Sequence, residues 1–265
     1  MRALVGYGLP MRSRRLLVLP ALLLLVGCGG ADGSERIAAS AQATLDAGTA
    51  RFALSQEFTG GEQGTGSVAG EGELDFDNAR GRVTTLLPGT EVESIFDGSV
   101  VFIRFPEGTA PTPWVRIDIE QAESIPELEQ LGELSTDPSQ NLAFLQGVSG
   151  EVEEVGQEEV RGVEATHYRM TVDLQQAADR AEEDARAYLQ QQIEGLGVSE
   201  LPTEVWLDGD SRIVRQTYTV DVSDTQVATT VEYFDFGSEV DVEPPAEAEV
   251  TDFAELLEAA PSEGG

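Results

Sequence analysis

The chain has 265 residues, with 16 Lys and Arg against 49 Asp and Glu and a formal net charge of −33 at pH 7. Such an acidic surface argues against nucleic acid as a partner and against adsorption to anionic phospholipid headgroups. The single cysteine excludes an internal disulfide and a thiolate metal cluster.

Residues 1–27 have the pattern of a secretory signal peptide, because arginines precede an apolar run over 16–27 that is too short to cross a bilayer. The run ends in Leu25-Val26-Gly27-Cys28, which resembles the lipobox of bacterial lipoproteins, where the cysteine is diacylated and becomes the first residue. We therefore expect an extracytoplasmic protein that is anchored to the cell membrane through Cys28, with residues 28–33 as a lipidated tether. The alternative is an ordinary signal peptide with a buried structural cysteine.

The N-terminal half of the mature chain predicts one helix followed by a meander of strands. Ile37, Ala41 and Leu45 recur at four-residue spacing, which predicts a helix over residues 34–47. From Thr49 the apolar residues alternate, as in half-buried strands. The predicted strands cover residues 49–58, 67–77, 80–87, 91–96, 99–105 and 114–119.

The C-terminal half predicts two further helices and more hairpins. An acidic stretch over residues 120–135 is predicted to be a loop. Helices are predicted over 137–148, where Pro follows a capping Asp, and over 175–196, which carries a continuous apolar stripe. Residues 246–265 are rich in Ala and Glu, and the pattern is compatible with a terminal helix or a disordered tail. The predicted strands cover residues 152–155, 158–174, 203–207, 212–222 and 226–236.

These elements predict the α+β class. Ten or eleven antiparallel strands form a sheet that coils rather than stays flat, and its apolar concave face needs the helices as a cover. The folded domain is predicted over residues 34–245, followed by an acidic tail over 246–265.

The order of elements resembles a known family. The segments that carry the resemblance are Val160 to Arg169 before the long helix, Val205-Trp206-Leu207-Asp208-Gly209-Asp210 after it, and Tyr233-Phe234-Asp235-Phe236-Gly237 near the end. Together with the lipobox, they make the chain similar to actinobacterial lipoproteins of the LppX/LprA/LprF/LprG group, relatives of the LolA/LolB carriers. The resemblance implies a half-barrel around helices, with an apolar cavity for acyl chains of lipids or glycolipids, and a function in lipid binding or transfer.

A lipid carrier needs a shielded apolar volume and no reactive groups, so no cofactor is expected. We expect a monomer that binds lipid or glycolipid, with a membrane transporter as a possible partner. Candidate cavity residues are those that share one face of a strand or helix, and many of them will be ordinary core. They are Phe52, Leu54, Phe58, Val101, Ile103, Val115, Ile117, Leu142, Leu145, Tyr168, Met170, Val172 and Leu189.

Other chemistry has weak support in the sequence. His167 is the only histidine, and the strand pattern places it opposite Tyr168 and Met170, toward solvent. The acidic turns near Asp75 and Asp208 are predicted to be hairpin turns rather than calcium loops. Two rival hypotheses remain: a sensor or interaction lipoprotein of the same fold that engages a membrane protein, and a hydrolase, which lacks a nucleophile–base set.

Overall fold

The structure is a computed structural model of the whole chain, and the part that it describes begins at Gly33. Contacts divide the chain into residues 1–30 and 31–265, and every helix and strand described below belongs to the second unit. The predicted signal peptide, Cys28 and the loop predicted over 120–135 lie outside the described residues. The described residues are 33–61, 64–87, 89–106, 108, 110–118, 138–181, 186, 189, 190, 193, 194, 197–222 and 224–259.

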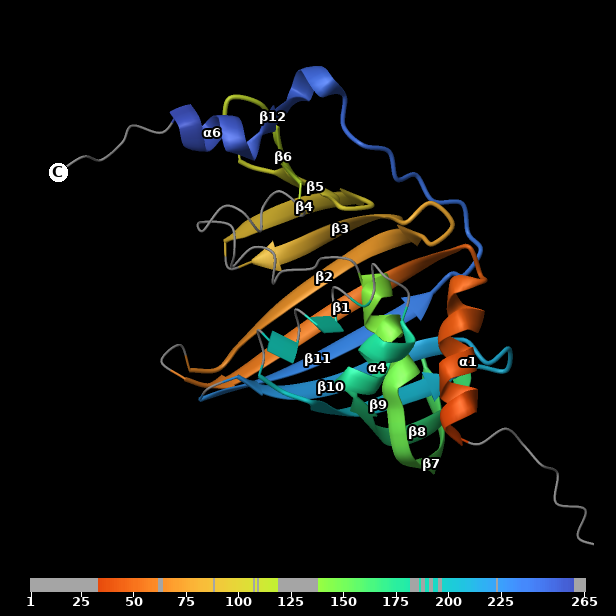
Figure 1. The fold of residues 1–265 in the computed structure, drawn as a ribbon. Helices are drawn as coiled ribbons and strands as arrows, with labels where there is room; N and C mark the ends of the chain where they lie inside the picture. The colour runs from red at the N-terminus through yellow and green to blue at the C-terminus, as the bar shows by residue number, and fades with distance from the viewer. Residues whose placement is uncertain are drawn as a thin grey trace, which may run out of the picture. The chain divides into compact units, whose positions relative to one another are not determined.

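One curved, open sheet of twelve strands dominates this unit (Figure 1). The strand order is β12-β6-β5-β4-β3-β2-β1-β11-β10-β9-β8-β7, and all neighbours are antiparallel except β12 and β6. The predicted α+β class and curved sheet are thus confirmed. The sheet has twelve strands where about ten or eleven were expected, and one pair of neighbours is parallel rather than antiparallel. In chain order the strands are β1 (Thr49–Gly60), β2 (Gly66–Asp75), β3 (Arg80–Leu87), β4 (Thr90–Asp97), β5 (Val100–Arg104), β6 (Trp114–Asp118), β7 (Val148–Val160), β8 (Val163–Asp173), β9 (Glu200–Leu207), β10 (Ile213–Val222), β11 (Thr225–Phe234) and β12 (Val250–Asp252).

Three helical segments lie on one side of the sheet, which we call the inner face. They are α1 (Gly33–Leu45), the 3-10 helix η1 (Pro138–Gly147) and α4 (Leu174–Arg180). They pack on one another and mainly on β7, β8 and β10 (Figure 1). The inner face of those strands is therefore the most completely covered by described helices.

Two predicted helices differ from those observed. The segment predicted over 137–148 is a 3-10 helix rather than an α-helix. The long helix predicted over 175–196 is interrupted, because Ala181 has an extended backbone with φ −72° and ψ 155°. Residues 186, 189, 190, 193 and 194 are helical again beyond this break. The apolar stripe continues across the break, so the sequence pattern alone does not reveal it.

The C-terminal segment, whose composition is compatible with a helix or a tail, takes part in the fold. After the 3-10 turn η2 (Glu247–Glu249), β12 pairs in parallel with β6, and α6 (Phe253–Ala259) follows. The sheet therefore continues beyond residue 245, the predicted end of the domain. On the outer face, Val242 packs with Ile95, Phe102 and Trp114, so the preceding segment covers the apolar outer side of β4 to β6.

Candidate functional site

The inner face of the sheet carries no charged side chain over nine described strands, β1 to β6 and β9 to β11. The strand registers place every acidic and basic residue of these strands on the outer face. Since 49 residues of the chain are acidic, this separation is a strong pattern rather than a consequence of low charge. The inner-face positions include Phe52, Leu54, Gln56, Phe58, Val68, Gly70, Gly72, Val83, Val92, Phe96, Val101, Ile103, Val115, Ile117, Thr203, Val205, Gln216, Tyr218, Val220, Val227, Thr229, Val231 and Tyr233.

Most of the predicted cavity residues meet in one apolar cluster between the sheet and the helices. Leu142 and Leu145 of η1, with Leu189, belong to the same buried cluster as residues of β1, β5 and β8. The predicted residues within the buried cluster are Phe52, Val101, Leu142, Leu145, Tyr168, Met170, Val172 and Leu189, with Leu54 and Ile103 partly buried against it. The structure thus brings ten of the thirteen together.

Val115 and Ile117 lie on the inner face of β6 but belong to a separate cluster. Phe253 and Leu256 of α6 pack against them, with Ile103 in contact with both clusters. The C-terminal helix therefore occupies a part of the inner face that was predicted to line the cavity.

Phe58 lies in neither cluster and is only half-buried. It is near the end of β1, where Phe58 faces Val227 of β11 and Gly66 of β2. Leu54 and Val68 on the same face are half-buried as well. Burial of the inner face thus decreases toward this end, which the hairpins β1–β2, β3–β4 and β10–β11 share (Figure 1).

A row of uncharged polar side chains crosses the inner face next to this half-covered end. Gln56 lies opposite Thr229, and Tyr218 lies opposite Thr229 and Thr203. Gln56 Nε2 lies 3.4 Å from Thr229 Oγ1. Burial raises the pKa of Tyr218 to about 12, with a smaller opposing effect from the hydrogen bond with Thr229. The phenol is therefore neutral at ordinary pH and can donate a hydrogen bond.

Sequence reasoning missed this polar row. Its members come from strands that lie far apart in the chain, and each one alone resembles an ordinary polar residue of a strand. The register of β1, β10 and β11 is what aligns them, and hydrophobic alternation does not contain that register.

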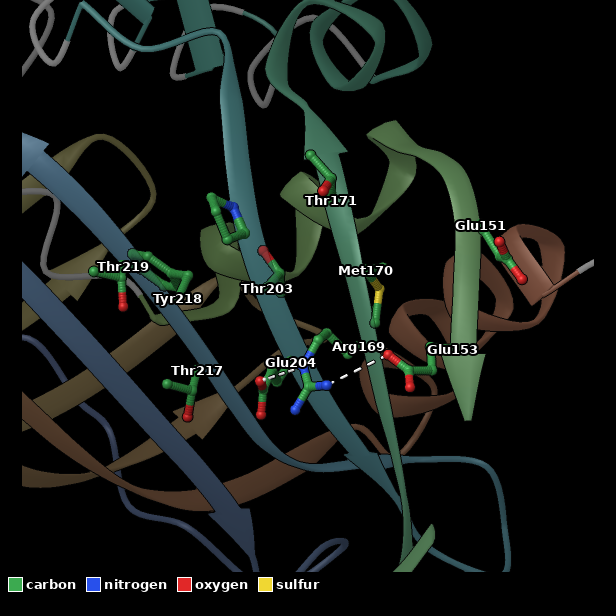
Figure 2. A pocket seen from close by; sticks show the side chains of 11 residues that line it. Glu151, Glu153, Arg169, Met170, Thr171, Thr203, Glu204, Thr217, Tyr218 and Thr219 are labelled. Carbon is green, nitrogen blue, oxygen red and sulfur yellow. Dashed lines mark hydrogen bonds and ion pairs between the residues drawn. The ribbon is translucent and has the colours of Figure 1, made fainter. Parts of the chain in front are cut away.

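Two described hollows open on the outer face of the sheet. One, of about 570 Å³, lies over β7 to β10 (Figure 2). Arg169 crosses it, with Nε donating to Glu204 at 2.9 Å and Nη1 to Glu153 at 3.3 Å. The other, of about 540 Å³, lies over β1 to β4 and β11, and its lining includes Glu71, Glu91, Arg161 and Glu232. Charged walls disfavour an acyl chain in either hollow.

His167 belongs to this charged outer face, as predicted, but it is buried rather than solvent-exposed. It is only 5% exposed because its ring stacks on Trp206, with centroids 4.1 Å apart. Nδ1 lies 3.1 Å from Glu158 Oε1, and Nε2 lies 2.8 Å from Glu204 Oε2. Both ring nitrogens are thus engaged by carboxylates, which gives the histidine a structural role in joining β7, β8 and β9.

Two further observations concern the described residues only. None of their helices combines the length and apolar character that a bilayer crossing requires. Within the same part of the chain, His, Asp and Glu side chains form no group of three or more that could hold a metal ion.

The fold and the inner face define a class: an open, curved α+β sheet with one uncharged apolar side that helices partly cover. No protein-family model matches the sequence. Among curated proteins, the chain is similar to an uncharacterized 31.2 kDa protein of the rplA–rplJ intergenic region of Streptomyces griseus, with 37% identity over 134 residues. The alignment covers 48% of this chain and 44% of that protein, so the chain spans less than half of this relative's length.

Two solved structures carry names from the group that the sequence resembles. The chain is similar to the lipoprotein LppX of Mycobacterium tuberculosis, with 13% identity, 79% of this chain and 99% of that chain covered, and a TM-score of 0.49. It is also similar to LprF of Mycobacterium bovis, with 14% identity, 80% and 96% covered, and a TM-score of 0.47.

Proposed function

We propose that this chain binds the acyl chains of a lipid or glycolipid on the inner face of its sheet and carries them within the cell envelope. The observation that supports this proposal best is the absence of charge from the inner face of nine described strands in a protein of net charge −33. A charge beside an acyl chain would lose its hydration, whereas each buried CH₂ contributes roughly 0.8 kcal/mol to binding. An uncharged apolar face therefore suits an acyl chain better than a polar ligand.

Within this face, the half-covered end is the part best suited to the ligand. Leu54, Phe58 and Ile103 are half-buried there and would contact the acyl chain. The fully buried members of the predicted set would form the hydrophobic core beneath it. The row formed by Gln56, Tyr218 and Thr229 would meet a neutral polar part of the lipid, such as an ester or a sugar hydroxyl.

The anchor is the second part of the proposal. Removal of residues 1–27 would leave Cys28 as the lipid-modified first residue, and residues 28–33 would form a tether on the extracytoplasmic side of the cell membrane. Two acyl chains on Cys28 hold a protein stably at a bilayer. A monomer at that position could receive lipid from, or pass it to, a membrane transporter.

No catalytic step is part of this function. His167 is the only histidine, and both of its ring nitrogens already face carboxylates, at 3.1 Å for Glu158 and 2.8 Å for Glu204. This arrangement supports a structural histidine rather than a general base.

The test uses residues 31–265, which form one compact unit. The protein is purified from a lipid-rich host and analysed by native mass spectrometry and by solvent extraction. We expect co-purifying acyl lipid. Leu54→Glu, which places a charge on the inner face, should reduce the lipid-bound fraction strongly, while Ser55→Glu on the outer face should leave it unchanged. A protein that is always empty, and whose melting temperature does not rise with added lipid, contradicts the proposal.

A second candidate is an interaction lipoprotein of the same fold that engages a membrane protein. Its support comes from the close packing of Leu142, Leu145 and Leu189 against the inner face, together with outer-face hollows of about 570 and 540 Å³. This candidate predicts no lipid in the purified protein and no effect of Leu54→Glu on partner binding. The same lipid measurements therefore separate the two functions.

A further inference from the structure

Two adjacent leucines are exposed at the end of β3. Leu86 is 57% exposed and Leu87 is 39% exposed. The described residues contain two other exposed large apolar side chains, Val155 and Val163, and neither is next to another. Scattered single apolar residues are normal on a protein surface, but a pair at the tip of a hairpin concentrates apolar area at a protruding point.

The pair lies at the end of the sheet where the inner face is least covered. Leu87 occupies an inner-face position opposite Thr90, and Leu86 occupies the outer face opposite Glu91. Phe58, the half-buried aromatic of the inner face, is near the end of β1 that leads into the neighbouring hairpin. Leu87 therefore extends the apolar inner face to the edge of the protein, while Leu86 adds apolar surface on the outer side of the same strand end.

The described helix α1 leads into the opposite end of the sheet. It ends at Leu45, four residues before β1 begins at Thr49, and Thr49 pairs with Asp75 at the last position of β2. Figure 1 shows α1 beside that end and the β3–β4 hairpin directed away from it. Exposed apolar side chains and the half-covered inner face thus share one end.

We propose that Leu86 and Leu87 insert into a lipid surface, so that the open end of the inner face meets the membrane from which lipid is taken up or to which it is released. We infer a lipid surface with little negative charge, because exposed Glu91 flanks the two leucines and the chain as a whole is strongly acidic. Anionic headgroups would repel such a surface, and salt would screen that repulsion. The purpose of the contact rests on the proposed function, but the contact itself can be measured separately.

The experiment is vesicle flotation with residues 31–265, which lack Cys28 and hence any acyl anchor. Vesicles of phosphatidylcholine alone are compared with vesicles that contain phosphatidylglycerol. We expect binding to the phosphatidylcholine vesicles, and weaker binding to the anionic ones that recovers when salt is raised. Leu86→Asp combined with Leu87→Asp should lower the partition coefficient at least about tenfold, since both apolar side chains lose their favourable transfer.

The matched control is Val163→Asp. Val163 is 44% exposed and lies at the turn between β7 and β8, at the other end of the sheet. Its substitution should leave flotation unchanged. A second measurement places an environment-sensitive fluorophore on Leu87→Cys or on Val163→Cys, and only the first should shift to the blue with vesicles.

Equal flotation of the double variant and the unmodified protein overturns the inference, as does tighter binding to anionic vesicles or a fluorophore at position 87 that does not respond. Lipid content measured by mass spectrometry is independent of these results. A protein that floats through Leu86 and Leu87 but never contains lipid refutes the proposed function and leaves the membrane contact standing. A protein that contains lipid but whose flotation does not depend on the two leucines refutes the membrane contact and leaves the proposed function standing.

Discussion

The ring of Phe52 on β1 lies over Gly72, its partner on β2. A Cβ atom on Gly72 would stand 2.6 Å from Phe52 Cε1 and would also collide with the carbonyl oxygen of Arg82. The same relationship recurs on the next strand pair, where the ring of Phe96 on β4 fills the space above Gly81 on β3. Gly72 and Gly81 on this inner face thus make room for aromatic rings of the core.

The contact between Phe52 and Gly72 predicts that a methyl group added at position 72 destabilises the protein. Gly72→Ala should lower the free energy of unfolding by about 1–3 kcal/mol, because the core around Phe52 has no room to accept it. The measurement is urea unfolding followed by circular dichroism. Gly66→Ala is the matched control on β2, since nothing lies within 4 Å of a Cβ there. A loss at Gly66 as large as at Gly72 would contradict the explanation by contact with the ring.

The outer-face histidine cluster predicts a loss of stability in acid. Hydrogen bonds from Trp206 and His167 hold the pKa of Glu158 below its ordinary value. Burial raises the pKa of Glu204, but hydrogen bonds from Arg169 and His167 outweigh it, so that pKa is lowered as well. The unfolded chain therefore binds more protons than the folded chain near the ordinary carboxylate pKa, and stability falls as the pH decreases through it.

The check is the free energy of unfolding between about pH 7 and pH 3, where we expect the decrease to begin near pH 5. Glu204→Gln should flatten part of this dependence, whereas Glu71→Gln, on the exposed outer face of β2, should not. An identical pH profile for Glu204→Gln and the unmodified protein would show that the cluster does not couple folding to protonation.

Tyr218 predicts the opposite behaviour in alkali. Because its pKa is raised to about 12, the folded protein keeps the phenol proton at a pH where the unfolded chain has lost it. The contribution is constant below the ordinary tyrosine value near 10 and is lost as the pH rises from there toward 12. Tyr218→Phe should therefore be less sensitive to alkali between about pH 10 and 11.5. A parallel decline in Tyr218→Phe and the unmodified protein would exclude this role for Tyr218.

We expect the C-terminal helix α6 to stabilise the protein, because it packs against the inner face of β6. Phe253→Ala removes part of the cover over Val115 and Ile117 and should destabilise the protein by about 1–3 kcal/mol. Glu255→Ala on the same helix is exposed and should have little effect. The two melting temperatures are compared in one scan. If they fall equally, α6 stabilises the chain by some means other than its contact with β6.

The lipid anchor is tested in the intact precursor. Cys28→Ser should abolish incorporation of labelled fatty acid and move the protein from the membrane fraction to the soluble fraction. Gly30→Ala, which leaves the cysteine in place, should stay in the membrane fraction. Retention of Cys28→Ser together with unchanged acyl labelling would show that the attachment site lies elsewhere.

The sequence by itself determined most of the strands of this protein and which side chains of a strand share a face. Alternation places Phe52 and Leu54 on one side of β1, and Tyr168 and Met170 on one side of β8, because a strand has a period of two. The apolar stripe of residues 174–193 likewise indicates a buried helical face, although the break at Ala181 is invisible to it.

Only the tertiary structure decided what those faces meet. Contacts between distant segments decide that Phe52 fills the space above Gly72 and that α6 covers Val115 and Ile117. They also decide which polar residues align with Tyr218. Periodicity records which side of an element is apolar, but it contains neither the register between strands nor the volume that opposing side chains fill. The ten strand residues of the predicted cavity lie on the inner face, and packing divides the thirteen residues between the buried core, the α6 contact and the half-covered end near Phe58.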